Sequence, residues 1–92
     1  MNSMLQEEKR YIFFYINRDE PEKIRQVVPA HVTYWKTANL KDYLGGPFGD
    51  RTGGSISFIA YDLDEASKII MADPFVEKNL IAHKWIKEWN VE

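Results

Sequence analysis

The segment at residues 10–16 constrains the fold most, because its pattern predicts a β-strand that is apolar on both faces. Aromatic and branched residues fill it, and it stops at the turn-forming residues 17–19. Alternate side chains of a strand point to opposite faces. Here the two sets are Tyr11, Phe13 and Tyr15 against Ile12, Phe14 and Ile16. Such a strand needs a covering layer on each side of its sheet.

A first helix is predicted from about residue 20 to about residue 40. Asp19 offers a carboxylate for the N-cap, Pro21 suits the first turn, and Glu22 lies three residues after the cap. Pro29 lies inside this helix, where it removes a backbone donor and is expected to bend the helix just before His31. A tolerated kink, a break between two shorter helices and a bend with a functional purpose all stay open.

Two further strands and a glycine-rich connection follow. Residues 43–48 and 55–61 have strand character, and residues 49–54 join them. The glycines match neither common phosphate-binding pattern, and they join strand to strand, whereas a phosphate loop joins strand to helix. We therefore interpret the connection as a flexible hairpin.

A second helix and a final strand complete the chain. Asp62 at the N-cap and Glu65 three residues later begin the helix, which should extend to Met71 or the residue after it and stop at Pro74. Residues 80–89 alternate as a strand. Lys and Glu side chains toward its end indicate the edge of a sheet or a strand that runs beyond the core.

This order of elements predicts an α+β fold of the ferredoxin-like βαββαβ type, a four-stranded antiparallel sheet with two helices on one face. We expect one domain over residues 1–92, with its core at about 10–90. The other face of the sheet, with Trp85 and Trp89 beside the first strand, is too apolar for a monomer. A chain this short buries only about 60 to 65% of its unfolded surface, so we predict a symmetric homodimer packed sheet to sheet.

Composition excludes several classes of function. The 12 Lys and Arg residues are scattered among 14 Asp and Glu residues, a pattern that predicts no nucleic-acid partner. The absence of cysteine excludes disulfides, thiolate zinc sites and a cysteine nucleophile. The first ten residues are too polar for a signal peptide, and no apolar run approaches about 18 residues. We therefore expect no membrane partner and a cytoplasmic location.

His31 and Asp73 form the best candidate site. His31 lies on the apolar stripe of the first helix, in helical register with Ile24, Val28 and Trp35, where a titratable ring needs a partner. Asp73 falls at the end of the second helix, where the helix dipole disfavours an exposed carboxylate by roughly 0.3 to 1 kcal/mol. A positive or proton-donating partner would explain its position, and so would a solvated Asp-Pro turn.

The remaining candidates are weaker. Aromatic side chains could form a pocket beside the pair, although their default place is the core. The six candidates are Tyr11, Phe13, Tyr15, Trp35, Phe48 and Phe75. Ser55 and Ser57 are conceivable nucleophiles that nothing singles out. His83 lies on the aromatic face of the last strand and is expected to be a hydrogen-bonded structural histidine, because a metal site would need ligands that the chain hardly has.

Three short motifs carry a family resemblance. They are Pro29-Ala30-His31, Gly46-Pro47-Phe48 and Ala72-Asp73-Pro74-Phe75. Together they resemble the YCII-related family of small dimeric α+β barrel proteins over residues 10–90. The resemblance implies that His31 and Asp73 are a catalytic dyad, in a cleft between the helices and the sheet near the dimer interface. The chain departs from the family at Val28, where a basic residue is frequent, and at Arg51, where smaller residues are common.

Two functions follow from these residues. In the first, His31 acts as general base and acid and Asp73 holds its tautomer, in an isomerisation, lactone or elimination reaction of a small cyclic or aromatic substrate. This chemistry needs no cofactor or metal. In the second, the chain is a non-catalytic homodimeric ligand-binding module in which the pair fixes helix packing. A haem or metal protein of the same barrel class is a third hypothesis, resting on His31, His83 and fold analogy.

Overall fold

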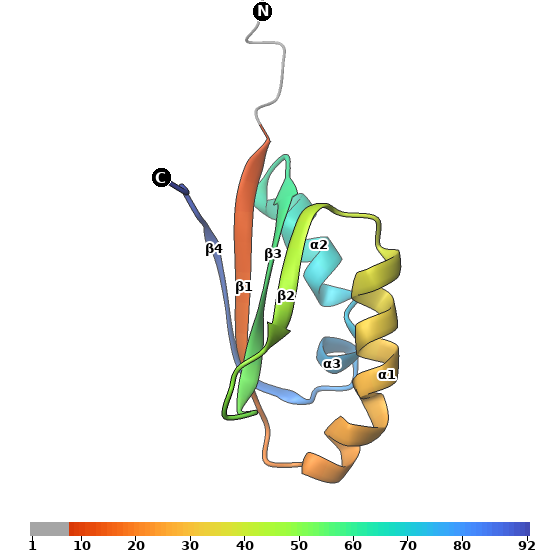
Figure 1. The fold of residues 1–92 in the computed structure, drawn as a ribbon. Coiled ribbons are helices and arrows are strands. Elements are labelled where there is room, and N and C mark those ends of the chain that lie inside the picture. Colours follow the sequence, from red (N-terminus) through yellow and green to blue (C-terminus); the bar gives the residue numbers. More distant parts are fainter. Residues whose placement is uncertain (1–7) are drawn as a thin grey trace, which may run out of the picture.

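The computed structural model describes residues 8–92 (Figure 1), so the polar lead at residues 1–7 lies outside the described part. Its elements are β1 (Lys9–Asn17), α1 (Pro21–Thr37), β2 (Lys41–Pro47), β3 (Gly53–Ala60), α2 (Leu63–Met71), α3 (Pro74–Glu77) and β4 (Ile81–Glu88). The strands form one antiparallel sheet in the order β2-β3-β1-β4, and the helices lie on one face of it (Figure 1). The predicted ferredoxin-like α+β fold is confirmed. None of the helices in the described part is long and apolar enough to span a membrane.

The central strand β1 pairs with β3 on one side and β4 on the other. Tyr11, Phe13 and Tyr15 face the helices and are buried. Phe14 lies on the opposite face, where its ring stacks on Trp85 at a centroid distance of 5.1 Å. The prediction of a strand with two apolar faces is therefore confirmed.

Helix α1 differs from the prediction at both ends. Its N-cap is Glu20 instead of Asp19, the Glu20 side chain makes no capping hydrogen bond, and the helix ends at Thr37, slightly earlier than predicted. Pro29 does not break the helix. Because Pro29 is exposed, the carbonyl group that loses its helical partner can bind water, while Trp35 anchors the inner face in the core.

Helix α2 begins as predicted. The Asp62 carboxylate accepts a hydrogen bond from the backbone N–H of Glu65 at 2.8 Å, and the Glu65 side chain accepts one from the backbone N–H of Tyr61 at 2.8 Å. These bonds satisfy amide groups at the helix start that have no partner inside the helix.

The prediction of two helices is wrong, because α3 follows α2 directly. Asp73 is the N-cap of α3, and its side chain accepts a hydrogen bond from the backbone N–H of Phe75. Pro74 takes the first helical position, where its missing N–H group costs nothing. The proline that ends one helix thus also begins the next.

The edge strands are β2 and β4, and an edge position was predicted for the last strand. Strand β2 begins at Lys41, earlier than predicted, and its pairing with β3 contains an irregularity beside Asp42, whose φ is 51°.

Strand β3 begins at Gly53, where a Cβ atom would lie 1.8 Å from the carbonyl oxygen of Tyr15. Only glycine avoids that collision, which explains why the strand pair closes so tightly at this point.

Candidate active site

The Asp73 carboxylate has no exposed surface and is surrounded by three hydrogen-bond donors. Trp35 donates from Nε1 to Oδ2 at 2.9 Å, and Phe75 donates from its backbone N–H to Oδ1 at 2.8 Å. His31 Nδ1 lies 2.8 Å from Oδ1 and 3.0 Å from Oδ2. These donors satisfy a carboxylate that would otherwise be costly to bury.

Helix geometry brings the donors together. His31 and Trp35 are four residues apart on α1, so they lie one above the other on its inner face. Asp73 lies between α2 and α3 and caps α3. Asp73 directly follows Ala72, the C-cap of α2, as predicted, and it has proton-donating partners in His31 and Trp35. The sequence did not predict that Asp73 also lies at the start of α3, where free backbone amide groups favour an acceptor.

The contact with Asp73 determines which nitrogen of His31 is free. A carboxylate accepts hydrogen bonds, so Nδ1 carries the hydrogen and Nε2 is the nitrogen that can take up or release a proton. The ring is also fixed in orientation, because it stacks on Phe75 at a centroid distance of 4.0 Å and an interplanar angle of 12°. The His31 side chain keeps 13% of its surface exposed. A reachable ring with a fixed tautomer suits general acid–base catalysis.

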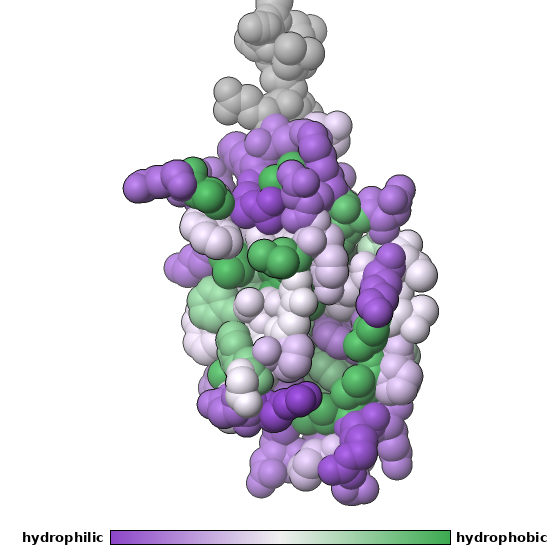
Figure 2. Space-filling model, viewed as in Figure 1, coloured by the Kyte–Doolittle hydropathy of each residue, from purple (hydrophilic) through white to green (hydrophobic). Residues whose placement is uncertain are grey.

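His31 lies in the wall of a cavity of about 970 Å³ between α1, β2 and the β2–β3 hairpin. Figure 2 shows an apolar column along α1 on this side of the molecule, with hydrophilic groups at its two ends. Of the six aromatic residues predicted to line a pocket, half line this cavity: Tyr15, Trp35 and Phe75. The other three do not: Tyr11 and Phe13 belong to the core, and Phe48 lies outside the lining.

The Tyr15 hydroxyl is a second polar group of this cavity. The whole residue is 4% exposed, and its hydroxyl forms no hydrogen bond with any residue from 8 to 92. The hydroxyl oxygen is not fully buried, because Asn17 Oδ1 is the only fully buried side-chain oxygen or nitrogen without a partner in this range. Gly54 makes room for it, because a Cβ atom there would lie 2.7 Å from the hydroxyl oxygen. Burial, then the charge of Asp73 and then Tyr43 raise the pKa of Tyr15 above its ordinary value. The phenol therefore keeps its hydrogen and is available as a donor.

The motifs around this site can be compared with known families. A family model for the YCII-related domain matches residues 9–90. The chain belongs to the YCII-related family. A comparison with curated protein sequences found no significant match.

Several solved structures share the fold of this YCII-related chain. A 5-chloro-2-hydroxyhydroquinone dehydrochlorinase from Burkholderia phenoliruptrix, in complex with 2,5-dihydroxybenzoquinone, is 21% identical with a TM-score of 0.77, over 88% of this chain and 93% of that chain. A cofactor-independent oxygenase from Streptomyces nogalater is 9% identical with a TM-score of 0.54, over 91% and 92% of the two chains. A hydroxynitrile lyase from Passiflora edulis is 11% identical with a TM-score of 0.55, over 96% of each chain. At these identities the likeness shows the fold.

Tyr43 lines the cavity of this YCII-related protein, although its sequence pattern did not single it out. Its ring stacks on Trp35 at a centroid distance of 6.2 Å, and burial followed by the charge of Asp73 raises its pKa. A Cβ atom at Gly45 would lie 2.8 Å from the Tyr43 hydroxyl oxygen, so the glycine lets the ring lie along β2. The sequence signal that could have indicated this position is the spacing of Tyr43 and Gly45, a tyrosine followed two residues later by a glycine that leaves room for its ring.

The other candidate residues lie away from this cavity. The Ser57 hydroxyl accepts a hydrogen bond from Arg10 at 2.8 Å and donates one to the carbonyl oxygen of Tyr11 at 3.0 Å, and neither it nor Ser55 lines the cavity. His83 is exposed on β4 without a hydrogen bond to the described residues, so the expectation of a hydrogen-bonded structural histidine is wrong. Between residues 8 and 92, no three His, Asp or Glu side chains cluster as metal ligands would.

Removing the Asp73 carboxylate should destabilise the fold more than removing the His31 ring. Asp73→Ala leaves two buried N–H groups without an acceptor, which costs roughly 2 to 4 kcal/mol of unfolding free energy. His31→Ala leaves the carboxylate with two donors and costs about 1 kcal/mol. Urea denaturation followed by circular dichroism measures both values. A loss for His31→Ala as large as that for Asp73→Ala would show that the ring is there for packing.

Tyr15 should limit the stability of the fold at alkaline pH. Its pKa is raised above the ordinary value of 10.0, so the folded chain holds a proton that the unfolded chain releases. This contribution to stability is complete below about pH 10 and is lost as the pH rises further. The unfolding free energy of the wild type should therefore fall more steeply above about pH 10 than that of Tyr15→Phe. Equal slopes in the two proteins would contradict the assignment.

Proposed function

We propose that this chain is a cofactor-independent enzyme that transfers protons on a small cyclic or aromatic substrate, in an isomerase, lyase or elimination reaction. One observation carries the proposal: Asp73 holds His31 through Nδ1 while the same ring borders a cavity of about 970 Å³. A pair that serves only to pack two helices has no need of a cavity beside its ring.

Each group has a role in the proposed reaction. His31 Nε2 takes a proton from a carbon or hydroxyl group of the bound ring, and Asp73 stabilises the imidazolium that forms. The electron pair left on the substrate moves toward a carbonyl oxygen attached to the ring. This oxygen accepts a hydrogen bond from the Tyr15 hydroxyl. In an isomerisation the imidazolium returns the proton to another atom. In an elimination the electron pair instead expels a leaving group from the neighbouring carbon.

The names of the structural neighbours support small-molecule chemistry for this site. One is a dehydrochlorinase bound to a dihydroxylated quinone, one is a cofactor-independent oxygenase, and one is a hydroxynitrile lyase. Dehydrochlorination is an elimination, which a base and a donor to the substrate oxygen can promote together. Chlorinated hydroquinones are therefore a sensible first group of test compounds for this chain.

We further propose that the active form is a cytoplasmic homodimer packed through the open face of the sheet. Phe14 and Trp85 form a stacked aromatic pair on that face, and Trp85 is 42% exposed. The side chains of Ile12 and Ile16 lie on the same face of β1, and both are only partly buried. A second copy related by two-fold symmetry would cover this surface with its own equivalent residues. The absence of cysteine is compatible with a reducing compartment.

A panel of small ring compounds tests the proposed reaction and searches for the substrate at the same time. Chlorinated hydroquinones and enolisable cyclic ketones are incubated with the protein in D₂O, and NMR records deuterium uptake, isomerisation or loss of chloride. At least one compound should be turned over, and His31→Ala should lower its rate by roughly 10²- to 10⁴-fold, the contribution of a general base.

Thr33→Ala is the control, because it truncates an exposed side chain of α1 that lies outside the cavity and away from the open face of the sheet, and it should leave the rate unchanged. Equal rates in wild type and His31→Ala would contradict the proposal. Compounds that bind without His31-dependent turnover would favour the alternative function, a non-catalytic homodimeric ligand-binding module.

A further inference from the structure

The charges around the cavity are unequal. Its lining contains four cationic residues, namely Arg18, Arg25, Lys36 and Arg51, and one carboxylate, that of Asp19. The Asp73 carboxylate lies behind the His31 ring, outside this lining, and already has three donors, so it offers little to a ligand. A cavity with this lining favours an anion over a cation or a neutral molecule.

Two of the four cations already have partners. Arg25 forms an ion pair with Glu22 within α1. The Arg18 guanidinium donates to the backbone oxygen of Asn79 at 2.9 Å and to its side-chain oxygen at 3.2 Å. The Asn79 oxygens carry no charge, so they hold the Arg18 guanidinium in place without neutralising it. The side chains of Lys36 and Arg51 form no hydrogen bond and no ion pair with residues 8–92. Their charged groups are therefore the ones free to bind a ligand.

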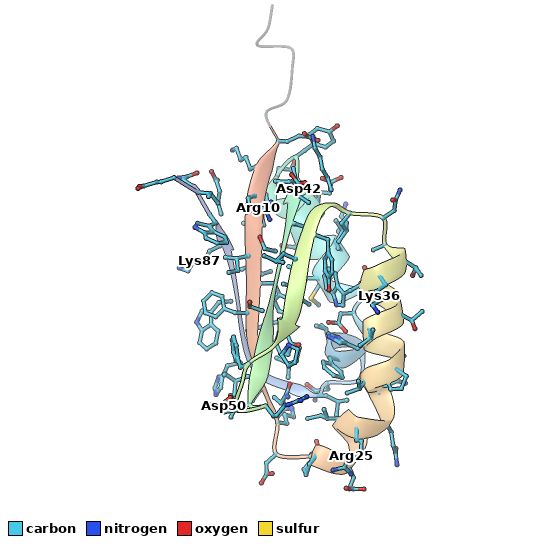
Figure 3. The ribbon with its side chains drawn as sticks, in the orientation of Figure 1. Arg10, Arg25, Lys36, Asp42, Asp50 and Lys87 are labelled. Atoms are coloured by element: carbon cyan, nitrogen blue, oxygen red, sulfur yellow. The ribbon has the colours of Figure 1, made fainter. Side chains whose placement is uncertain are left out.

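The hairpin gives Arg51 its place in the cavity lining. Arg51 has a φ of 65°, and its backbone N–H donates to the carbonyl oxygen of Phe48 at 3.0 Å. The neighbouring Asp50 carboxylate accepts hydrogen bonds from the backbone N–H and the hydroxyl of Thr52, at 3.0 and 2.7 Å. Asp50 does not line the cavity, and Figure 3 shows it on the side of the hairpin away from α1. The turn thus keeps the Arg51 guanidinium apart from the Asp50 carboxylate, its nearest neighbour of opposite charge along the chain.

The walls between these cations suit a flat apolar ring. Val28 and Val32 of α1 line the cavity and are 38% and 39% exposed, and Lys36 follows them one turn later on the same side of the helix (Figure 3). The stacked rings of Trp35 and Tyr43 form another part of the wall. Exposed valines beside unpaired cations are expected where an amphipathic ligand is bound.

We propose that the substrate is a planar ring acid, whose ring lies between these apolar walls and whose ionised acid group binds Arg51 at the cavity rim, with Lys36 adding to the positive potential. This inference rests on the proposed function, since it names the substrate class of the same site. Arg51 suits the role because its guanidinium can bind a carboxylate through two parallel hydrogen bonds.

A pair of probes with the same shape and different charge tests the inference. 4-Hydroxybenzoate and 4-hydroxybenzamide are titrated into the protein of residues 1–92. Binding is followed by the NMR signal of the Trp35 indole N–H, assigned with Trp35→Phe. The acid should bind roughly tenfold more tightly than the amide, the effect of one charge-assisted pair. Added salt should reduce this preference.

Variants locate the charge that causes the preference. Arg51→Gln should abolish most of it, and Lys36→Gln should reduce it by a smaller factor. Lys78→Gln is the matched control, because Lys78 at the C-cap of α3 is likewise exposed and unpaired within residues 8–92 but lies outside the cavity and away from the open face of the sheet. Equal binding of the two probes, binding of neither, or a preference that survives Arg51→Gln would overturn the inference.

The test separates this inference from the proposed function. Probe binding needs no turnover, so His31→Ala should keep the preference for the acid while losing any catalytic activity. Turnover that depends on His31 but shows no charge preference would overturn the substrate class alone. A charge preference without His31-dependent turnover would support the anion site and overturn the proposed reaction.

Discussion

The buried carboxylate of Asp73 is the constraint on which the rest of the structure depends. A carboxylate without solvent contact needs several donors, and it finds them in the Trp35 indole, the His31 imidazole and the first free amide of α3. Meeting all three fixes the rotation of α1 about its axis and its distance from the α2–α3 junction. The same contacts that hold the helices together therefore also hold the imidazole in place.

This arrangement separates the stability of the site from its proposed reactivity. The carboxylate keeps two of its donors even if the His31 ring is removed, so the fold does not depend on the group proposed to react. The Tyr15 hydroxyl has the opposite status, because it has no hydrogen-bond partner in the described part of the chain and borders the cavity. A free donor beside a base is well placed to bind a substrate oxygen.

The order of the elements, the fold and the family could be predicted from the sequence because they depend on local patterns. Apolar alternation marked the central strand, and cap residues marked the start of α2. The third helix was missed because Pro74 carries the same local signal for ending a helix and for starting one. Only the position of Asp73 relative to α1 distinguishes the two, and that position is a tertiary property.

The lining of the cavity was harder to predict for a related reason. Tyr11, Phe13 and Tyr15 share one face of β1, and their periodicity gives them equal claims to the pocket. Their paired residues on the neighbouring strand β3 differ, since Tyr11 lies opposite Phe58 and Tyr15 lies opposite Gly54. A bulky partner fills the space above the strand, while glycine leaves room for the tyrosine ring to reach the cavity. The pairing register between strands decides the outcome, and a single strand does not encode it.

The central claim is that Asp73 fixes the tautomer of His31 and leaves Nε2 free to exchange a proton. ¹⁵N NMR of the imidazole nitrogens tests it most directly, at a pH where the ring is neutral, in the wild type and in His83→Ala to assign the signals. The account predicts that Nδ1 carries the hydrogen and that Nε2 shows the shift of an unprotonated nitrogen. A neutral ring with its hydrogen on Nε2 would contradict the account, because the nitrogen facing Asp73 would then have no hydrogen to donate.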